Sequence, residues 1–122
     1  MAEPKVFSRE TFEAQYANGQ PWPVAITLAY LGGKWKPALL YLVALGIGRF
    51  GEMQRRLPGI SRTVLTYELR ALERDGLLHR ETFGEVPPRV EYTLTERGRS
   101  CLPILQAMCA WGQQILAEKV AA

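Results

Sequence analysis

Hydrophobic residues recur at helical spacing through most of the chain, and the clearest repeat follows Ser61. Leu65, Leu69 and Leu72 stand at positions i, i+4 and i+7, which predicts one helical face packed on a core. Ser61 is a favourable N-cap, and Asp75-Gly76 supplies a helix stop. The pattern predicts a helix of about four turns starting at Ser61. Its apolar stripe comprises Val64, Leu65, Leu69 and Leu72.

Three helical patterns come earlier in the chain. Residues 8–17 form a short amphipathic pattern in which Phe12 and Tyr16 lie one turn apart. Pro23 to Leu31 predicts a second helix, with Pro23 suited to its first turn and glycines after its end. Trp35 to Leu45 is apolar nearly all round, which is typical of a buried central helix.

A short connecting region separates the central helix from the helix at Ser61. Arg49-Phe50 is long enough only for a stub of strand, and residues 51–59 predict a short helix with Gly51 as a weak cap. Two helices joined by a short glycine-containing turn form a helix-turn-helix, whose second helix enters the major groove of DNA. The stretch from Gly51 to Asp75 fits that arrangement.

Two extended runs, residues 77–83 and 89–95, flank the segment Gly-Glu-Val-Pro-Pro. The second run alternates apolar and polar residues, which predicts a half-buried strand and hence an antiparallel hairpin. Its apolar face comprises Val90, Tyr92 and Leu94. Arg89 lies beside the tip, where it is placed to reach a DNA groove or a phosphate; the alternative is a solvated hairpin residue.

The chain ends in a long helical pattern. Thr95 can cap a helix that runs from Glu96 toward Lys119, and Pro103 is expected to kink it. Beyond the kink lies an apolar face too large for a terminal helix to leave exposed, so we expect a partner chain to cover it. We assign dimerisation to this face and to the first helix: Phe12, Tyr16, Leu105, Met108, Trp111, Ile115 and Leu116.

These elements predict a mainly α fold with a small β-hairpin (α+β), namely a winged helix-turn-helix with additional N- and C-terminal helices. At 122 residues the chain is expected to form a single domain, 1–122. Its terminal dimerisation helices are expected at residues 8–17 and 96–119.

The face of the 61–75 helix opposite the leucines carries side chains that suit base edges and phosphates. It combines fork-shaped cations, hydroxyls and a phenol: Arg62, Thr63, Thr66, Tyr67 and Arg70. An ordinary solvated helix surface is the alternative, because acidic residues are also present on this helix. We predict a DNA-binding set that adds Arg49, Arg55, Ser61 and Arg89 to these five.

Charge supports this assignment through its location. The net charge is +3, and between Arg49 and Arg80 seven arginines face four acids, which gives 7 − 4 = +3. The whole excess therefore surrounds the predicted reading helix. Arginine matches phosphates and guanine edges in two-point contacts, so the placement favours double-stranded DNA as the partner.

Other kinds of chemistry have little support in the sequence. The one histidine, His79, lacks metal-ligand spacing to other residues, and Cys101 and Cys109 do not form a metal pair. No nucleophile, base and orienting residue stand out as a set, so we expect neither an enzyme, a metal nor a cofactor. The polar N-terminus and the lack of a long apolar run predict a cytoplasmic protein without a membrane partner.

Several motifs are specific in combination. They are GGKW at 32–35, RF at 49–50, LPGIS at 57–61, a Leu-x-x-Leu-x-x-Asp-Gly-Leu spacing at 69–77, and VPPRVEY at 86–92. Together they resemble the HxlR-type transcriptional regulators, winged-helix relatives of the MarR group, over about residues 22–112. The resemblance implies a bacterial homodimer that dimerises through its terminal helices, inserts the Ser61 helix in the major groove, and uses the hairpin as a wing.

The sequence departs from that family at two positions. Family members often carry a cysteine where this chain has Trp22, and some use that cysteine to sense oxidants, so any thiol response here would involve Cys101 or Cys109. We expect apolar neighbours to make both thiols inert. Gly51 stands where the family usually has a serine, which would weaken a helix cap.

The leading interpretation is a homodimeric, sequence-specific regulator that binds a pseudo-palindromic operator. One alternative is a winged-helix protein-interaction module without DNA contact. Another is a small-molecule-binding protein whose effector pocket is lined by Trp22, Tyr30, Trp35 and Trp111. An effector could also regulate a DNA-binding protein, and ordinary core packing is the simpler explanation of these aromatics.

Overall fold

A computed structural model describes residues 8–19 and 21–121, with the backbone alone at residues 15–17. The chain divides into two compact units, Met1–Gly33 and Lys34–Ala122. The first unit contains α1 (Arg9–Ala17) and α2 (Pro23–Leu31), as the sequence predicts. Phe12 of α1 meets Trp22 edge to face with 5.5 Å between ring centroids. The side chain of Tyr16, predicted to pair with Phe12, lies outside the described residues.

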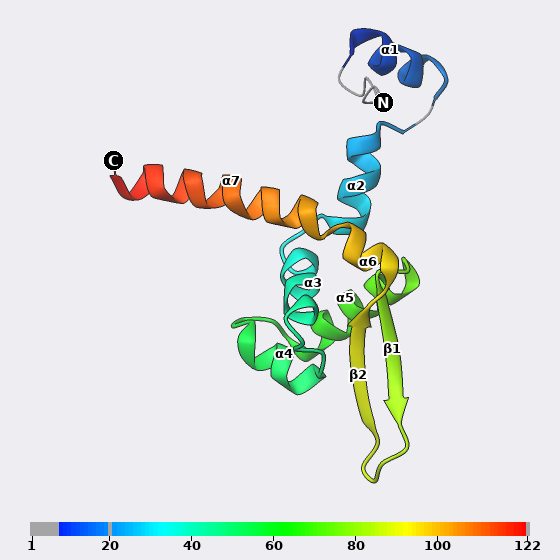
Figure 1. Ribbon diagram of the computed structural model, residues 1–122, viewed down its shortest axis with the longest axis vertical. Helices are drawn as coiled ribbons and strands as arrows, with labels where there is room; N and C mark the ends of the chain where they lie inside the picture. Colours follow the sequence, from blue (N-terminus) through cyan, green and yellow to red (C-terminus); the bar gives the residue numbers. More distant parts are fainter. Residues whose placement is uncertain (1–7, 20, 122) are drawn as a thin grey trace. The chain divides into compact units, whose positions relative to one another are not determined.

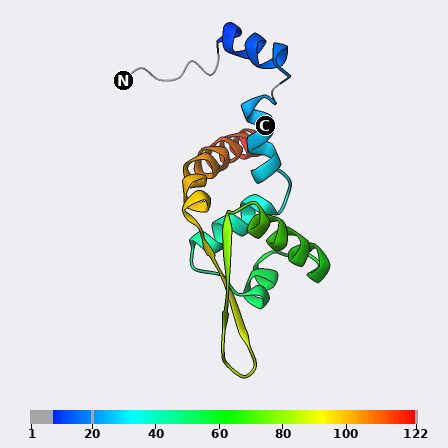
Figure 2. The ribbon, with the colours of Figure 1, turned by 90° about the vertical axis from the view of Figure 1, so that its right-hand side faces the viewer.

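The second unit is a winged helix-turn-helix, which confirms the predicted fold class. Its elements are α3 (Lys36–Ala44), α4 (Phe50–Arg56), α5 (Arg62–Arg74), β1 (Leu78–Phe83), β2 (Arg89–Leu94), α6 (Glu96–Ser100) and α7 (Leu102–Ala121). Figures 1 and 2 show the β1–β2 hairpin projecting past α4 and α5. Helix α5 and the hairpin therefore belong to one compact unit.

Helix α5 forms where its sequence signals predict. The Ser61 hydroxyl accepts a hydrogen bond from the Val64 amide at 3.0 Å, and Gly76 after the helix has φ +77°. Leu65, Leu69 and Leu72 are buried, and α5 contacts α3, where Leu39 and Leu40 are buried too. Val64 is 37% exposed, so its predicted place in the stripe is wrong. It is the third residue after the cap and lies outside the arc that the three leucines share.

The hairpin is fixed at its base to the helical core. The Tyr92 amide donates to the Gly48 carbonyl at 2.9 Å, and the Thr95 amide donates to the Leu77 carbonyl at 3.1 Å. Within the hairpin the strands are antiparallel, and Leu78 pairs with Leu94. The base of the wing is thus bonded both to the loop after α3 and to the start of β1.

The connection between α3 and α4 differs from the prediction. Arg49-Phe50 is not a strand stub, because Phe50 already begins α4 and Arg49 occupies the N-cap in an extended conformation. Gly51 is therefore inside the helix rather than its cap. The central helix ends at Ala44, and Leu45 after it is 72% exposed, so the predicted burial does not reach that residue.

The C-terminal helix also differs from its predicted form. Thr95 caps α6 as expected, accepting from the Gly98 amide at 3.0 Å, but α6 ends at Ser100 and α7 begins at Leu102. The chain therefore breaks into two helices at Cys101, instead of forming one kinked helix. Pro103 sits in the first turn of α7, where its missing N–H costs no helical hydrogen bond.

Gly98 is a position where only glycine fits. A Cβ there would collide with the Leu77 carbonyl oxygen and lie 3.2 Å from Leu94 Cδ2.

We predict that Gly98→Ala lowers the free energy of unfolding by about 1–3 kcal/mol, as overpacking typically does. Gly51→Ala is the control, because its Cβ would meet only the flexible end of Arg55 at 3.6 Å. Urea denaturation should show Gly51→Ala unchanged or slightly more stable; equal losses in both variants would contradict the packing described for Gly98.

Candidate nucleic-acid interface

The predicted reading residues gather on one surface of α5. All five line a single shallow groove of about 450 Å³: Arg62, Thr63, Thr66, Tyr67 and Arg70. Tyr67 is 66% exposed, and both arginines are exposed as well. Because the buried leucines occupy the opposite arc of the helix, this groove faces away from the core.

Local contacts order the first turn of that surface. The Arg62 guanidinium lies 4.9 Å from the Phe50 ring centroid, so a cation–π contact with α4 holds it near the helix start. The Thr66 hydroxyl donates to the Arg62 carbonyl at 2.9 Å, which leaves its oxygen free to accept from a base amino group. Ser61 already accepts from the backbone as the helix cap, so its first role is structural.

Helix α4 and its N-cap residue add further cations to the helix-turn-helix. Arg49 and Arg55 are exposed and line one hollow of about 350 Å³ together with Gly51 and Glu52. Glu52 also lies 3.6 Å from Arg56, in an exposed i,i+4 ion pair of small energetic weight. The structure thus brings the predicted residues Arg49 and Arg55 together at the N-terminal half of the helix-turn-helix.

Arg89, in the wing, contacts residues of its own hairpin. The β register pairs Arg89 with Phe83, and its guanidinium lies 4.2 Å from that ring centroid. Its Nη2 approaches Glu85 at 3.2 Å, and its Nη1 approaches Glu91 at 3.6 Å. Two carboxylates therefore compete with a phosphate for the Arg89 guanidinium.

This arrangement makes the wing electrostatically different from the reading helix. Residues 78–94 carry two arginines and three glutamates, 2 − 3 = −1, whereas residues 62–74 carry three arginines and two glutamates, 3 − 2 = +1. The attraction for a polyanion is therefore concentrated on the helix-turn-helix rather than on the hairpin.

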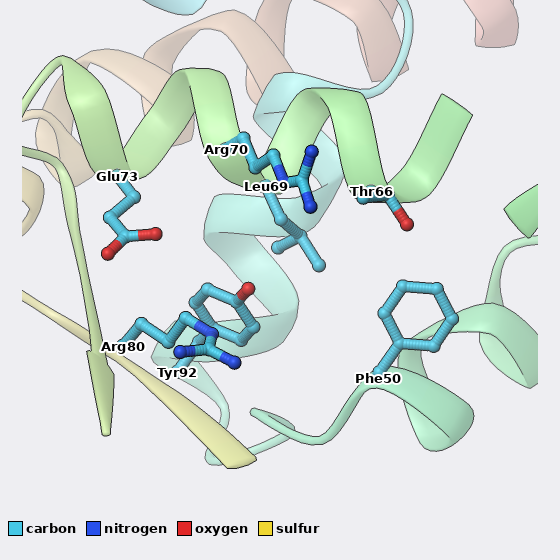
Figure 3. A pocket seen from close by; sticks show the side chains of 7 residues that line it. All are labelled: Phe50, Thr66, Leu69, Arg70, Glu73, Arg80 and Tyr92. Carbon is cyan, nitrogen blue, oxygen red and sulfur yellow. The ribbon is translucent and has the colours of Figure 1, made fainter. Parts of the chain in front are cut away.

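A second hollow, of about 420 Å³, opens between α5 and the hairpin. Figure 3 shows its lining residues, which come from α4, α5 and both strands: Phe50, Thr66, Leu69, Arg70, Glu73, Arg80 and Tyr92. Sequence reasoning missed Arg80. The signal was its register, because Arg80 pairs with Tyr92 and so shares the strand face that turns toward α5.

The residues proposed for dimerisation and for an effector have different surroundings. Leu105 is buried at 1% exposure, so its predicted place on a partner-facing surface is wrong. Met108, Trp111 and Leu116 remain exposed at 47%, 68% and 63%.

Among the aromatics predicted to line an effector pocket, Trp22 and Tyr30 belong to the first unit and Trp35 and Trp111 to the second. Neither unit brings the four together.

The two cysteines also differ from each other. Cys101 is buried, donates from Sγ to the Gly98 carbonyl at 3.0 Å, and burial raises the pKa of its thiol. That agrees with the predicted inert environment. Cys109 is exposed, so the predicted apolar burial of both thiols is wrong for Cys109.

Within residues 8–19 and 21–121, no group of three or more His, Cys, Asp or Glu side chains could hold a metal ion. His79 is exposed on β1. The same described residues include no helix long and apolar enough to cross a membrane.

Comparison with known proteins gives consistent results. The family model for the HxlR-like helix-turn-helix matches residues 30–120. The uncharacterized HTH-type transcriptional regulator YybR of Bacillus subtilis is 48% identical over 98 residues, covering 80% of this chain and 78% of that protein. An uncharacterized HTH-type transcriptional regulator of Methanothermobacter thermautotrophicus is 50% identical over 90 residues, covering 74% of this chain and 69% of that protein.

Solved structures show the same similarity. The redox regulator HypR in its reduced form has a TM-score of 0.76 at 45% identity, with 82% of this chain and 99% of that chain covered. A MarR-family regulator structure from Enterococcus faecalis V583 has a TM-score of 0.71 at 36% identity, covering 99% of this chain and 100% of that chain.

Proposed function

The chain belongs to the HxlR-like helix-turn-helix family and is a transcriptional regulator rather than an enzyme, and from that premise we propose that it binds a pseudo-palindromic DNA operator as a homodimer. In this proposal the whole chain, 1–122, acts as one DNA-binding domain in the cytoplasm. Helix α5 enters the major groove, and the β1–β2 hairpin reaches the neighbouring minor groove.

The α5 groove is the observation that carries the proposal. Five side chains with base- and phosphate-binding chemistry line one exposed surface, and the leucines behind them anchor that surface to the core. Arg62, Thr63 and Thr66 lie at the N-terminal end of the helix, the part that contacts base edges in helix-turn-helix proteins. Arg49 and Arg55 are suited to backbone phosphates beside the entry point.

Support for a homodimer comes from α7. Ile104, Met108, Trp111 and Ile115 follow at i, i+4, i+7 and i+11, so they share one helical face. Trp111 at 68% exposure is a large aromatic that its own unit leaves in solvent. A second copy of the chain could cover this stripe with its own α7, in a two-fold contact that also positions two α5 helices for two half-sites.

The reading assignment predicts a loss of sequence discrimination. Arg62→Ala or Thr63→Ala should reduce the preference for operator over scrambled DNA by about 1–3 kcal/mol, the usual worth of a good base contact. Fluorescence anisotropy with an operator selected from a random duplex pool measures both affinities. Arg74→Ala is the matched control, because Arg74 lies on the same helix outside the groove. Unchanged discrimination in both test variants would reject α5 as the reader.

The wing prediction concerns charge. Arg89→Ala should weaken binding to operator and scrambled DNA alike and flatten the salt dependence, as the loss of a phosphate contact does. Glu85→Gln with Glu91→Gln should act oppositely, because it frees the guanidinium from two carboxylates. Titrations at several salt concentrations compare the slopes. If Arg89→Ala had no effect in the double-Gln background, its phosphate contact would be excluded.

The dimer prediction concerns Trp111. Trp111→Ala should shift the protein toward monomer by about 2 kcal/mol or more, as truncation of a buried interface aromatic often does. Leu45→Ala is the control, since Leu45 is exposed and apolar but lies outside α7. Sedimentation equilibrium measures the dimer dissociation constant of each variant. A wild-type protein that is monomeric at micromolar concentration, or a constant unaffected by Trp111→Ala, would contradict the α7 interface.

A further inference from the structure

The hollow between α5 and the hairpin has a composition that suits a sugar-phosphate backbone. Arg70 reaches it from α5 and Arg80 reaches it from β1, and the two side chains lie on opposite sides of the opening (Figure 3). Leu69, which is buried, and Tyr92, which is nearly so, form an apolar surface between them. Cationic groups above an apolar floor match a phosphate attached to a deoxyribose ring.

The position of the hollow also suits DNA, given the proposed docking. The major and minor grooves of a duplex are separated by one sugar-phosphate strand. If α5 occupies the major groove and the hairpin the adjacent minor groove, that strand must cross the space between α5 and the hairpin. The hollow of about 420 Å³ occupies that space.

From this juxtaposition we propose that Arg70 and Arg80 together bind one phosphate of the crossing strand, with Arg80 as a backbone contact that does not read sequence. This inference rests on the proposed function. The Arg80 guanidinium is exposed, and its donation to Thr82 Oγ1 at 3.4 Å is a weak contact that leaves N–H groups for a phosphate. Arg70 is exposed at the same opening.

Glu73 is the opposing charge in this hollow. With two arginines and one glutamate among its lining residues, the site carries 2 − 1 = +1, so an anion is still attracted but less strongly than by the arginines alone. Removing the Glu73 charge should therefore strengthen DNA binding, whereas removing the Arg80 charge should weaken it. These opposite signs separate an electrostatic contact from a general effect on folding.

The test uses the full-length protein and a random-sequence duplex, titrated by fluorescence anisotropy between about 50 and 200 mM salt. Loss of one phosphate contact lowers the steepness of log affinity against log salt by about 0.9. The fold loss of affinity between the two salt concentrations should therefore be about three times smaller for Arg80→Gln than for the wild type. Arg80→Lys should retain most of the slope, because its charge remains. Arg74→Gln is the control: it removes an exposed arginine charge near the end of the same helix but outside the hollow.

Each outcome bears on the inference separately from the proposed function. An Arg80→Gln slope equal to that of Arg74→Gln, with sequence discrimination still lost in Arg62→Ala, would overturn the phosphate contact and leave the reading helix intact. A loss confined to an operator duplex would also overturn it, because Arg80 would then read a base. Tighter binding by Glu73→Gln, with unchanged circular dichroism for all variants, is the expected companion result.

Discussion

The packing of the α5 leucines on α3 determines which side chains of this protein can meet DNA. Leu65, Leu69 and Leu72 are buried on one arc of the helix. Because an α-helix has a regular geometry, burying that arc fixes the directions of all its other side chains. The arginines and threonines of the other arc must therefore face outward together. The same burial holds α5 beside β1, so the reading surface and the wing are positioned by one core.

Local signals predicted much of this architecture. Ser61 and Thr95 are caps whose hydrogen bonds involve residues three positions away, so a short window of sequence contains both partners. The hairpin followed from alternation, and α2 from its proline start and glycine end. By contrast, the supposed strand stub at Arg49-Phe50 became the start of a helix, because Arg49 can serve as an extended N-cap without a side-chain bond.

The parts that the sequence did not predict depend on contacts between segments. Arg89 looked like a free cation, but its charge meets Glu85 and Glu91 because the turn and the strand register place them around it. Leu105 looked like an interface residue, but its burial within the chain removes it from that role. Arg80 gained a role only when pairing with Tyr92 placed it on the face toward α5. Spacing along one element places Glu91 on the same strand face as Arg89, but it does not give the contact with Glu85 or the place of Arg80.

The exposed surface of α5 and the exposed stripe of α7 together give the account its central claim, that two copies of the chain place two reading helices on two half-sites of one duplex. Hydroxyl-radical footprinting on the DNA upstream of the protein's own gene tests it most directly. The account predicts two protected half-sites whose centres are about 34–36 Å apart, one helical turn, or a multiple of that distance. Protection of a single half-site by a monomer would contradict it.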